Sequence, residues 1–107
     1  MTPESSERTR QVYDDVATSL ADAGVTKGSM FGMPCLKTGK KVLAGLWGDA
    51  MNFKLPPQAR ESALALPGAE PFDPGMGRPM REWVLVPLAE AASWPGLAQQ
   101  ALDYVRE

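Results

Sequence analysis

The stretch CLKTGKKVLAGLWGDAMNFKL, Cys35–Leu55, decides the fold. Apolar and polar side chains alternate along much of it, which is the pattern of β-strands with one buried face. Two dipeptides that begin with glycine, Gly39-Lys40 and Gly48-Asp49, interrupt the alternation. Glycine at the first position of a two-residue loop favours a type II′ hairpin. The pattern predicts a meander of antiparallel strands from Val25 to Leu55, with a tight hairpin at each dipeptide.

If both loops contain two residues, the pairing of the strands follows by counting outward from each loop. The first hairpin then places Leu36 opposite Leu43 and Cys35 opposite Ala44. The pairs predicted for the second hairpin are Trp47–Ala50, Leu46–Met51, Ala44–Phe53 and Leu43–Lys54.

Because side chains alternate between the two faces of a strand, this pairing assigns each residue to a face. The predicted core face is apolar and comprises Cys35, Val42, Ala44, Leu46, Met51, Phe53 and Leu55. The opposite, mixed face comprises Leu36, Thr38, Lys41, Leu43, Gly45, Trp47, Ala50, Asn52 and Lys54. A slip of one residue would bury Lys54 and Asn52, so the register is strongly specified. The large apolar side chains on the mixed face need a cover, which the last helix or a second copy of the chain would supply.

Helical patterns flank the meander. Residues 5–23 have apolar side chains at helical spacing, with Ser6 as N-cap and Gly24 as the glycine that ends the helix. The C-terminal segment follows a predicted Ser93 cap and carries one apolar stripe: Trp94, Leu97, Ala98, Ala101, Leu102 and Val105.

Between them the sequence predicts a short helix over residues 57–66, a Pro- and Gly-rich loop over 67–81 that Phe72 pins to the body, and a strand at Trp83–Val86. The expected fold is a single α+β domain, residues 1–107, with an antiparallel β-meander sheet packed against N- and C-terminal helices.

The composition narrows the classes of function. The chain has 107 residues, 44% of them hydrophobic, and a net charge of −2, which is ordinary for a globular protein. It has no histidine and one cysteine, so histidine triads, internal disulfides and multi-cysteine metal sites are excluded. We expect no cofactor and no bound metal. The polar N-terminus and the lack of a long apolar run predict a cytoplasmic protein without a membrane span.

Charge is concentrated in the middle of the chain. Residues 27–60 contain six basic side chains and one acidic one, Asp49. This basic island could bind an anion, a nucleic acid or an acidic partner. Solvent-facing lysines on alternating strands explain it more simply, and a nucleic-acid-binding domain is normally far more basic. Direct nucleic-acid binding is therefore not expected.

A few residues are candidates for chemistry or binding. Cys35 could be a reactive thiol helped by Lys37, but we favour a small buried side chain. Lys54 could contact an anionic ligand or cover apolar sheet with its stem. The segment Gly75–Arg81 could hold phosphate through its arginines, although it matches no known phosphate loop and a plain connector is simpler. The predicted binding surface comprises Trp47, Lys54, Arg78 and Arg81.

Several short motifs, taken in order, resemble the N-terminal domain of the TfoX/Sxy family. They are Ser29-Met30-Phe31-Gly32-Met33, the glycine turn at Gly39, Phe53-Lys54-Leu55, Gly77-Arg78-Pro79-Met80, Trp83-Val84 and the closing helix. The resemblance covers about residues 8–106 and implies an α+β fold with a curved antiparallel sheet. Better-known members regulate competence and transcription and carry a further C-terminal helical domain, so the resemblance implies a stand-alone N-terminal-like domain here. It supplies no catalytic residues.

We therefore predict a non-enzymatic regulatory or adaptor module that binds a protein partner. Homodimerisation through the mixed face or a sheet edge would be one form of this. The alternative is a small anionic-ligand-binding protein, or a minor enzyme, that uses Lys54 and Arg78.

Overall fold

The structure is a computed structural model that describes residues 4–30, 32–73, 77 and 80–107. Its α-helices are α1 (Glu7–Leu20), α2 (Pro57–Leu64) and α3 (Trp94–Arg106), with 3-10 turns at Ala21–Ala23 and Leu88–Ser93. Its strands are β1 (Val25–Met30), β2 (Met33–Thr38), β3 (Lys41–Trp47), β4 (Ala50–Lys54), β5 (Glu70–Pro71) and β6 (Trp83–Pro87).

The strands form one antiparallel sheet in the order β1-β2-β3-β4-β6-β5. The first four make the predicted meander, and β6 adds to its free side, next to β4. The two-residue strand β5 lies inside the segment predicted to be an irregular loop, so that prediction was too simple there. The α+β architecture with terminal helices is confirmed.

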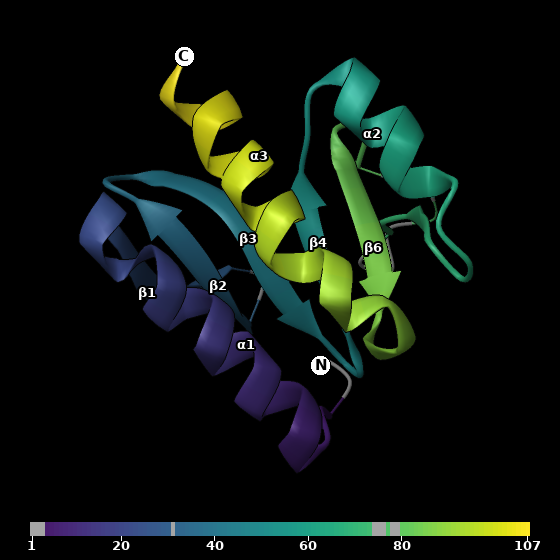
Figure 1. The fold of residues 1–107 in the computed structure, drawn as a ribbon, viewed down its shortest axis with the longest axis horizontal. Coiled ribbons are helices and arrows are strands. Elements are labelled where there is room, and N and C mark those ends of the chain that lie inside the picture. Colours follow the sequence, from purple (N-terminus) through teal and green to yellow (C-terminus); the bar gives the residue numbers. More distant parts are fainter. Residues whose placement is uncertain (1–3, 31, 74–76, 78–79) are drawn as a thin grey trace.

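Helices α1 and α3 cross one face of the sheet, with α2 beside β6 (Figure 1). We call this the helix face. The predicted stripe on the last helix is confirmed, because all six of its side chains are buried: Trp94, Leu97, Ala98, Ala101, Leu102 and Val105. These side chains join strand residues from β3, β4 and β6 in the main core.

Two of the three predicted helix-capping residues, Ser6 and Gly24, have the expected role, and Ser93 does not. The Ser6 hydroxyl accepts a hydrogen bond from the Thr9 N–H at 3.1 Å, which confirms it as the N-cap of α1. Gly24 has φ +89°, so it supplies the left-handed residue after the helical segment, as predicted. Ser93 precedes α3, but its side chain makes no capping hydrogen bond, so that part of the prediction was wrong. The 3-10 turn that runs directly into α3 leaves Ser93 in a helical conformation.

Register was predicted correctly for three of the four pairs in the second hairpin and wrongly in the first. The fourth pair, Leu43–Lys54, is wrong because the pairing of β3 with β4 stops at Ala44–Phe53. Trp47 pairs with Ala50 and Ala44 with Phe53, as counted. In the first hairpin Leu36 lies opposite Ala44 instead of Leu43.

The same slip places Cys35 opposite Gly45 instead of Ala44. The pairing shifts after Lys37–Val42, so Leu43 is an extra residue in β3, a β-bulge.

The bulge changes the face to which six side chains had been assigned. Thr38 and Lys41, which pair with each other and follow Val25 of the main core, lie on the helix face, so their placement on the mixed face was wrong. Because a bulge lets two consecutive residues point to one side, Leu43 and Ala44 are both buried in the main core. Leu36 joins them there, so its placement on the mixed face, like that of Leu43, was wrong. Cys35 and Val42 turn to the opposite face, so their predicted place on one face with Ala44 was also wrong, although Cys35 is fully buried as predicted.

The face opposite the helices carries a second, smaller core of Met33, Phe72 and Trp83, bordered by Trp47 and other partly buried side chains. Phe72 is fully buried, and its ring meets that of Trp47 edge-on with centroids 5.1 Å apart. The prediction that Phe72 pins its segment to the body is confirmed. Of the two covers considered for Trp47, the last helix was wrong, because α3 packs on the other face, and a second copy of the chain stays a prediction.

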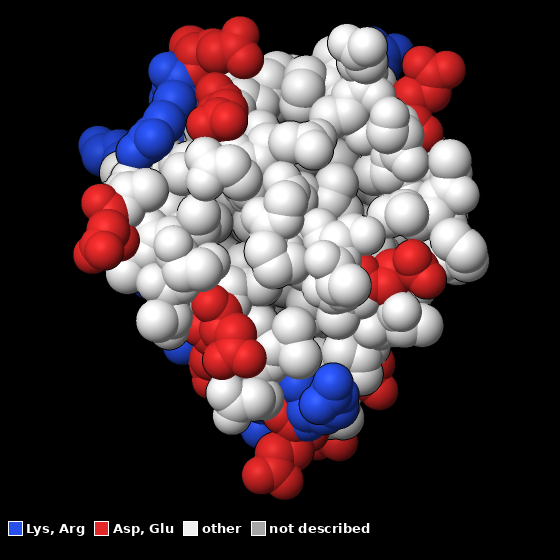
Figure 2. All heavy atoms as spheres, viewed as in Figure 1, with Lys and Arg blue, Asp and Glu red and all other residues white. Residues whose placement is uncertain are grey.

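On the helix face the charged side chains lie around the rim, where basic and acidic groups are close neighbours, and uncharged residues fill the middle (Figure 2). The basic island of the sequence therefore does not form one broad positive surface in this view. Among the described residues, no helix combines the length and the apolar character that crossing a membrane requires.

Candidate functional site

The sheet divides at one end, between β3 and β4. Their pairing stops at Ala44–Phe53, although β3 begins three residues earlier and β4 continues to Lys54. Beyond that point the start of β3 stays with β2, whereas Lys54 pairs with Trp83 of β6. Figure 1 shows the two strands separating there, with the C-terminal half of α3 above them.

A pocket of about 610 Å³ lies at this division. Its apolar lining comes from four side chains: Met30, Val42, Trp83 and Val105. Its polar lining comes from Lys40, Lys41, Lys54, Glu82, Tyr104 and Glu107. The volume is within the range of sites that hold small organic molecules, about 300–1,000 Å³.

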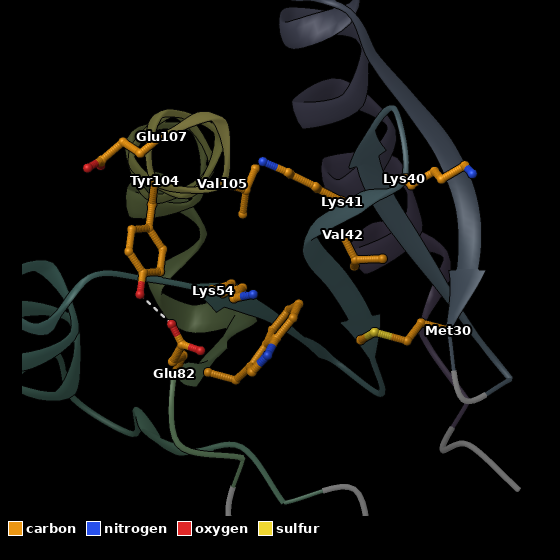
Figure 3. A pocket seen from close by; sticks show the side chains of 10 residues that line it. Met30, Lys40, Lys41, Val42, Lys54, Glu82, Tyr104, Val105 and Glu107 are labelled. Atoms are coloured by element: carbon orange, nitrogen blue, oxygen red, sulfur yellow. Dashed lines mark hydrogen bonds between the residues drawn. The ribbon is translucent and has the colours of Figure 1, made fainter.

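Two lysines enter the pocket from opposite faces of the sheet. Lys41 pairs with Thr38, which lies on the helix face, and its side chain runs toward the C-terminal turn of α3 (Figure 3). Lys54 pairs with Trp83 of the second core and points into the space between β4 and Val42. Both lysines line one pocket, although they lie on opposite faces, because the strands between them have separated.

The remaining charged groups differ in orientation. In Figure 3, Lys40 and Glu107 point away from the opening, whereas Glu82 faces it. The Tyr104 hydroxyl donates a hydrogen bond to a carboxylate oxygen of Glu82. This hydrogen bond is the main reason that the pKa of Tyr104 lies above its usual value. Glu82 is thereby held on the wall by α3.

The pocket lysines form no ion pair within the residues that the structure describes. Within the described parts of the chain, the ion pair at 4.0 Å or less is that of Lys27 with Asp14, at 2.6 Å. This pair lies at α1 and β1, away from the pocket. Lys41 and Lys54 therefore present unpaired positive charge to whatever enters.

The predicted surface residues are not gathered in this site. Lys54 lines the pocket, but Trp47 does not, because it packs against Phe72. Arg81 is exposed in the turn before β6 and is not among the lining residues. Arg78 lies outside the described residues.

Three side chains that line the pocket were not among the residues predicted from the sequence to bind: Lys41, Glu82 and Tyr104. Lys41 belongs to the basic island of residues 27–60, and that concentration of charge is the sequence feature that could have indicated its role. Glu82 and Tyr104 carried no sequence signal, because the contact between them joins segments 22 residues apart.

Cys35 has the surroundings of a structural residue. It is fully buried, and burial raises the pKa of its thiol despite the opposing influence of Lys37. Its carbonyl accepts a hydrogen bond from the Tyr13 hydroxyl at 3.1 Å. A buried thiol with a raised pKa is a poor nucleophile, which favours the interpretation of Cys35 as a small buried side chain.

Comparison of the sequence with protein-family models and with curated proteins, and of the fold with solved structures, gives no match. The resemblance to the TfoX/Sxy family rests on the sequence motifs and stays a prediction.

Proposed function

We propose that this protein is a non-enzymatic binding module that holds a small anion in the pocket between β3 and β4. The observation that carries the proposal is the convergence of Lys41 and Lys54, both without an acidic partner among the described residues, on one pocket. An anion between two ammonium groups gains charge-assisted hydrogen bonds, which are stronger than neutral ones. The proposal thus retains the alternative that the sequence suggested, a protein that binds a small anionic ligand through Lys54, and it adds Lys41 as the second basic residue.

Binding is favoured over catalysis by the chemistry of the lining. The protein has no histidine, and its cysteine is buried elsewhere in the sheet. The phenol of Tyr104 is engaged with Glu82 and has a raised pKa, which suits a donor rather than a base. The lining therefore lacks both the histidine and the thiol on which the common nucleophile–base pairs are built.

A regulatory role fits this site. The pocket touches β3, β4, β6 and α3, so a bound anion would link the two divided parts of the sheet through the last helix. Ligand binding to the folded state also stabilises it. The regulatory module expected from the TfoX/Sxy resemblance would then respond to a small anion, and a protein partner would sense the occupied form.

The test is thermal unfolding and calorimetric titration with a panel of small anions. We expect at least one anion to raise the melting temperature, and Lys41→Gln and Lys54→Gln each to weaken its binding about tenfold or more. Lys37→Gln is the matched control, because Lys37 lies on the same sheet but does not line the pocket. If no anion binds, or if Lys37→Gln weakens binding equally, the proposal is wrong.

A further inference from the structure

We infer that the ligand is an organic monoanion with an apolar body, such as an aryl-substituted carboxylic acid, and not an inorganic or polyvalent anion. This inference rests on the proposed function, since it specifies the ligand class of the same pocket. It follows from the apolar wall, the charge balance and the volume, each of which is independent of the others.

The apolar wall is continuous with the second core. Met30 and Val42 are partly buried side chains that pack against it, and Trp83 belongs to it with only 7% of its surface exposed. Val105, from the stripe of α3, completes the lining. A hydrated inorganic ion gains nothing from these four side chains, whereas a ring or branched chain is removed from water by them.

The charge balance favours a single negative charge. Lys41, Lys54 and Glu82 face the opening, and they leave one net positive charge. The two groups that point away, Lys40 and Glu107, cancel each other. A trivalent anion would exceed this charge and would meet the carboxylate of Glu82, and like charges at close range disfavour binding.

The volume of the pocket also favours an organic anion with an apolar body. A pocket of about 610 Å³ is much larger than acetate or phosphate, either of which would leave most of the lining in contact with water. The anionic group has its partners at the two lysines. The body of the ligand would therefore lie along Trp83, Val42 and Met30.

The experiment is a chemical-shift titration of the isotope-labelled protein with acetate, phenylacetate and 2-naphthylacetate, together with inorganic phosphate and citrate. The three acids share one carboxylate and differ in the size of the apolar body. We expect phenylacetate to bind at least about tenfold more tightly than acetate, and naphthylacetate more tightly still, because each added apolar carbon contributes burial. The indole N–H signal of Trp83 should move, whereas that of Trp94, in the main core, should not.

Val42→Thr gives a matched change in the wall, because threonine has nearly the shape of valine but carries a hydroxyl. We expect it to reduce the preference for phenylacetate over acetate about threefold or more. Lys54→Gln should instead weaken all the carboxylates by a similar factor.

The outcomes separate the two proposals. If phosphate or citrate binds as tightly as naphthylacetate, or if affinity does not rise along the acid series, the monoanion inference is wrong while the proposed function stands. If none of the five anions binds, both are wrong. An unchanged phenylacetate preference in folded Val42→Thr also contradicts the inference.

Discussion

At the scale of single residues, Asp49 makes several hydrogen bonds to other elements although its side chain is exposed. Its carboxylate accepts hydrogen bonds from the Ser6 N–H at 2.7 Å and from the Thr9 hydroxyl at 2.8 Å, while its carbonyl accepts one from the Leu88 N–H. Thr9 is completely buried, so its hydroxyl needs this partner. One turn residue thus connects the β3–β4 hairpin to the start of α1 and to the end of β6.

The hydrogen bond from the Ser6 N–H, followed by that from Thr9, holds the pKa of Asp49 below its ordinary value of 3.8. A carboxyl whose pKa is lower in the folded state stabilises that state above the unfolded pKa, and this stabilisation disappears as pH falls through the folded pKa. We expect Asp49→Asn to lower the denaturant midpoint at neutral pH, by an amount that shrinks below about pH 4. Denaturant unfolding at several pH values measures this difference.

Asp22→Asn is the control, because Asp22 is exposed and is not the N-cap of the 3-10 turn in which it lies. Its denaturant midpoint at neutral pH should match that of the unsubstituted protein. If Asp49→Asn lowers the denaturant midpoint by the same amount at every pH, the charge of Asp49 has no part in the stability.

At the scale of elements, close packing around Gly45 holds the centre of the sheet together. A Cβ at Gly45 would lie 2.7 Å from Asn52 Oδ1 and 2.8 Å from Met33 Cε. Asn52 is fully buried and its amide donates to Met33 Sδ at 3.6 Å. β3 therefore requires glycine here so that the buried amide and the thioether can approach the backbone.

We expect Gly45→Ala to destabilise the fold by about 2 kcal/mol, because overpacking a filled core forces neighbours out of place. Gly28→Ala is the matched control on the same face, since its Cβ would meet the flexible end of Lys37, at 3.0 Å. That change should alter stability by less than about 1 kcal/mol. Urea unfolding of both variants tests the expectation, and equal effects would contradict it.

At the scale of the whole molecule, one sheet supports two cores of unequal size. The helices bury the larger core, and the described part of the segment after α2 buries the smaller one through Phe72. Backbone hydrogen bonds hold Phe72 in place, from its own N–H to Trp83 and from the Met80 N–H to its carbonyl. Because Trp83 also lines the pocket, the smaller core positions one wall of the candidate site.

Phe72→Ala should therefore cost about 3 kcal/mol of stability and also change the environment of Trp47. The near-ultraviolet circular dichroism of the folded variant should lose part of its tryptophan signal, while the helical signal remains. Leu64→Ala, at an exposed position of α2, should change stability by less than about 0.5 kcal/mol. An unaltered tryptophan signal in folded Phe72→Ala would refute this role.

Local patterns were sufficient for much of the fold. Ser6, Gly24 and the stripe of α3 were correctly assigned because caps and helical periodicity depend on neighbours a few residues away. Three of the four pairs predicted for the second hairpin were also correct, since its loop of Gly48 and Asp49 sets the pairing near the turn.

The first hairpin and the site depended on contacts between distant segments. The bulge at Leu43 buries Leu36, Leu43 and Ala44 together under the helices, and no count outward from Gly39 contains that information. The pocket needs β3 and β4 to separate and α3 to cross above them. Lys54 could be singled out from its strand alone. That it lines one pocket with Lys41 and Glu82 depends on how the sheet divides, because only tertiary packing brings side chains so far apart in the chain to one place.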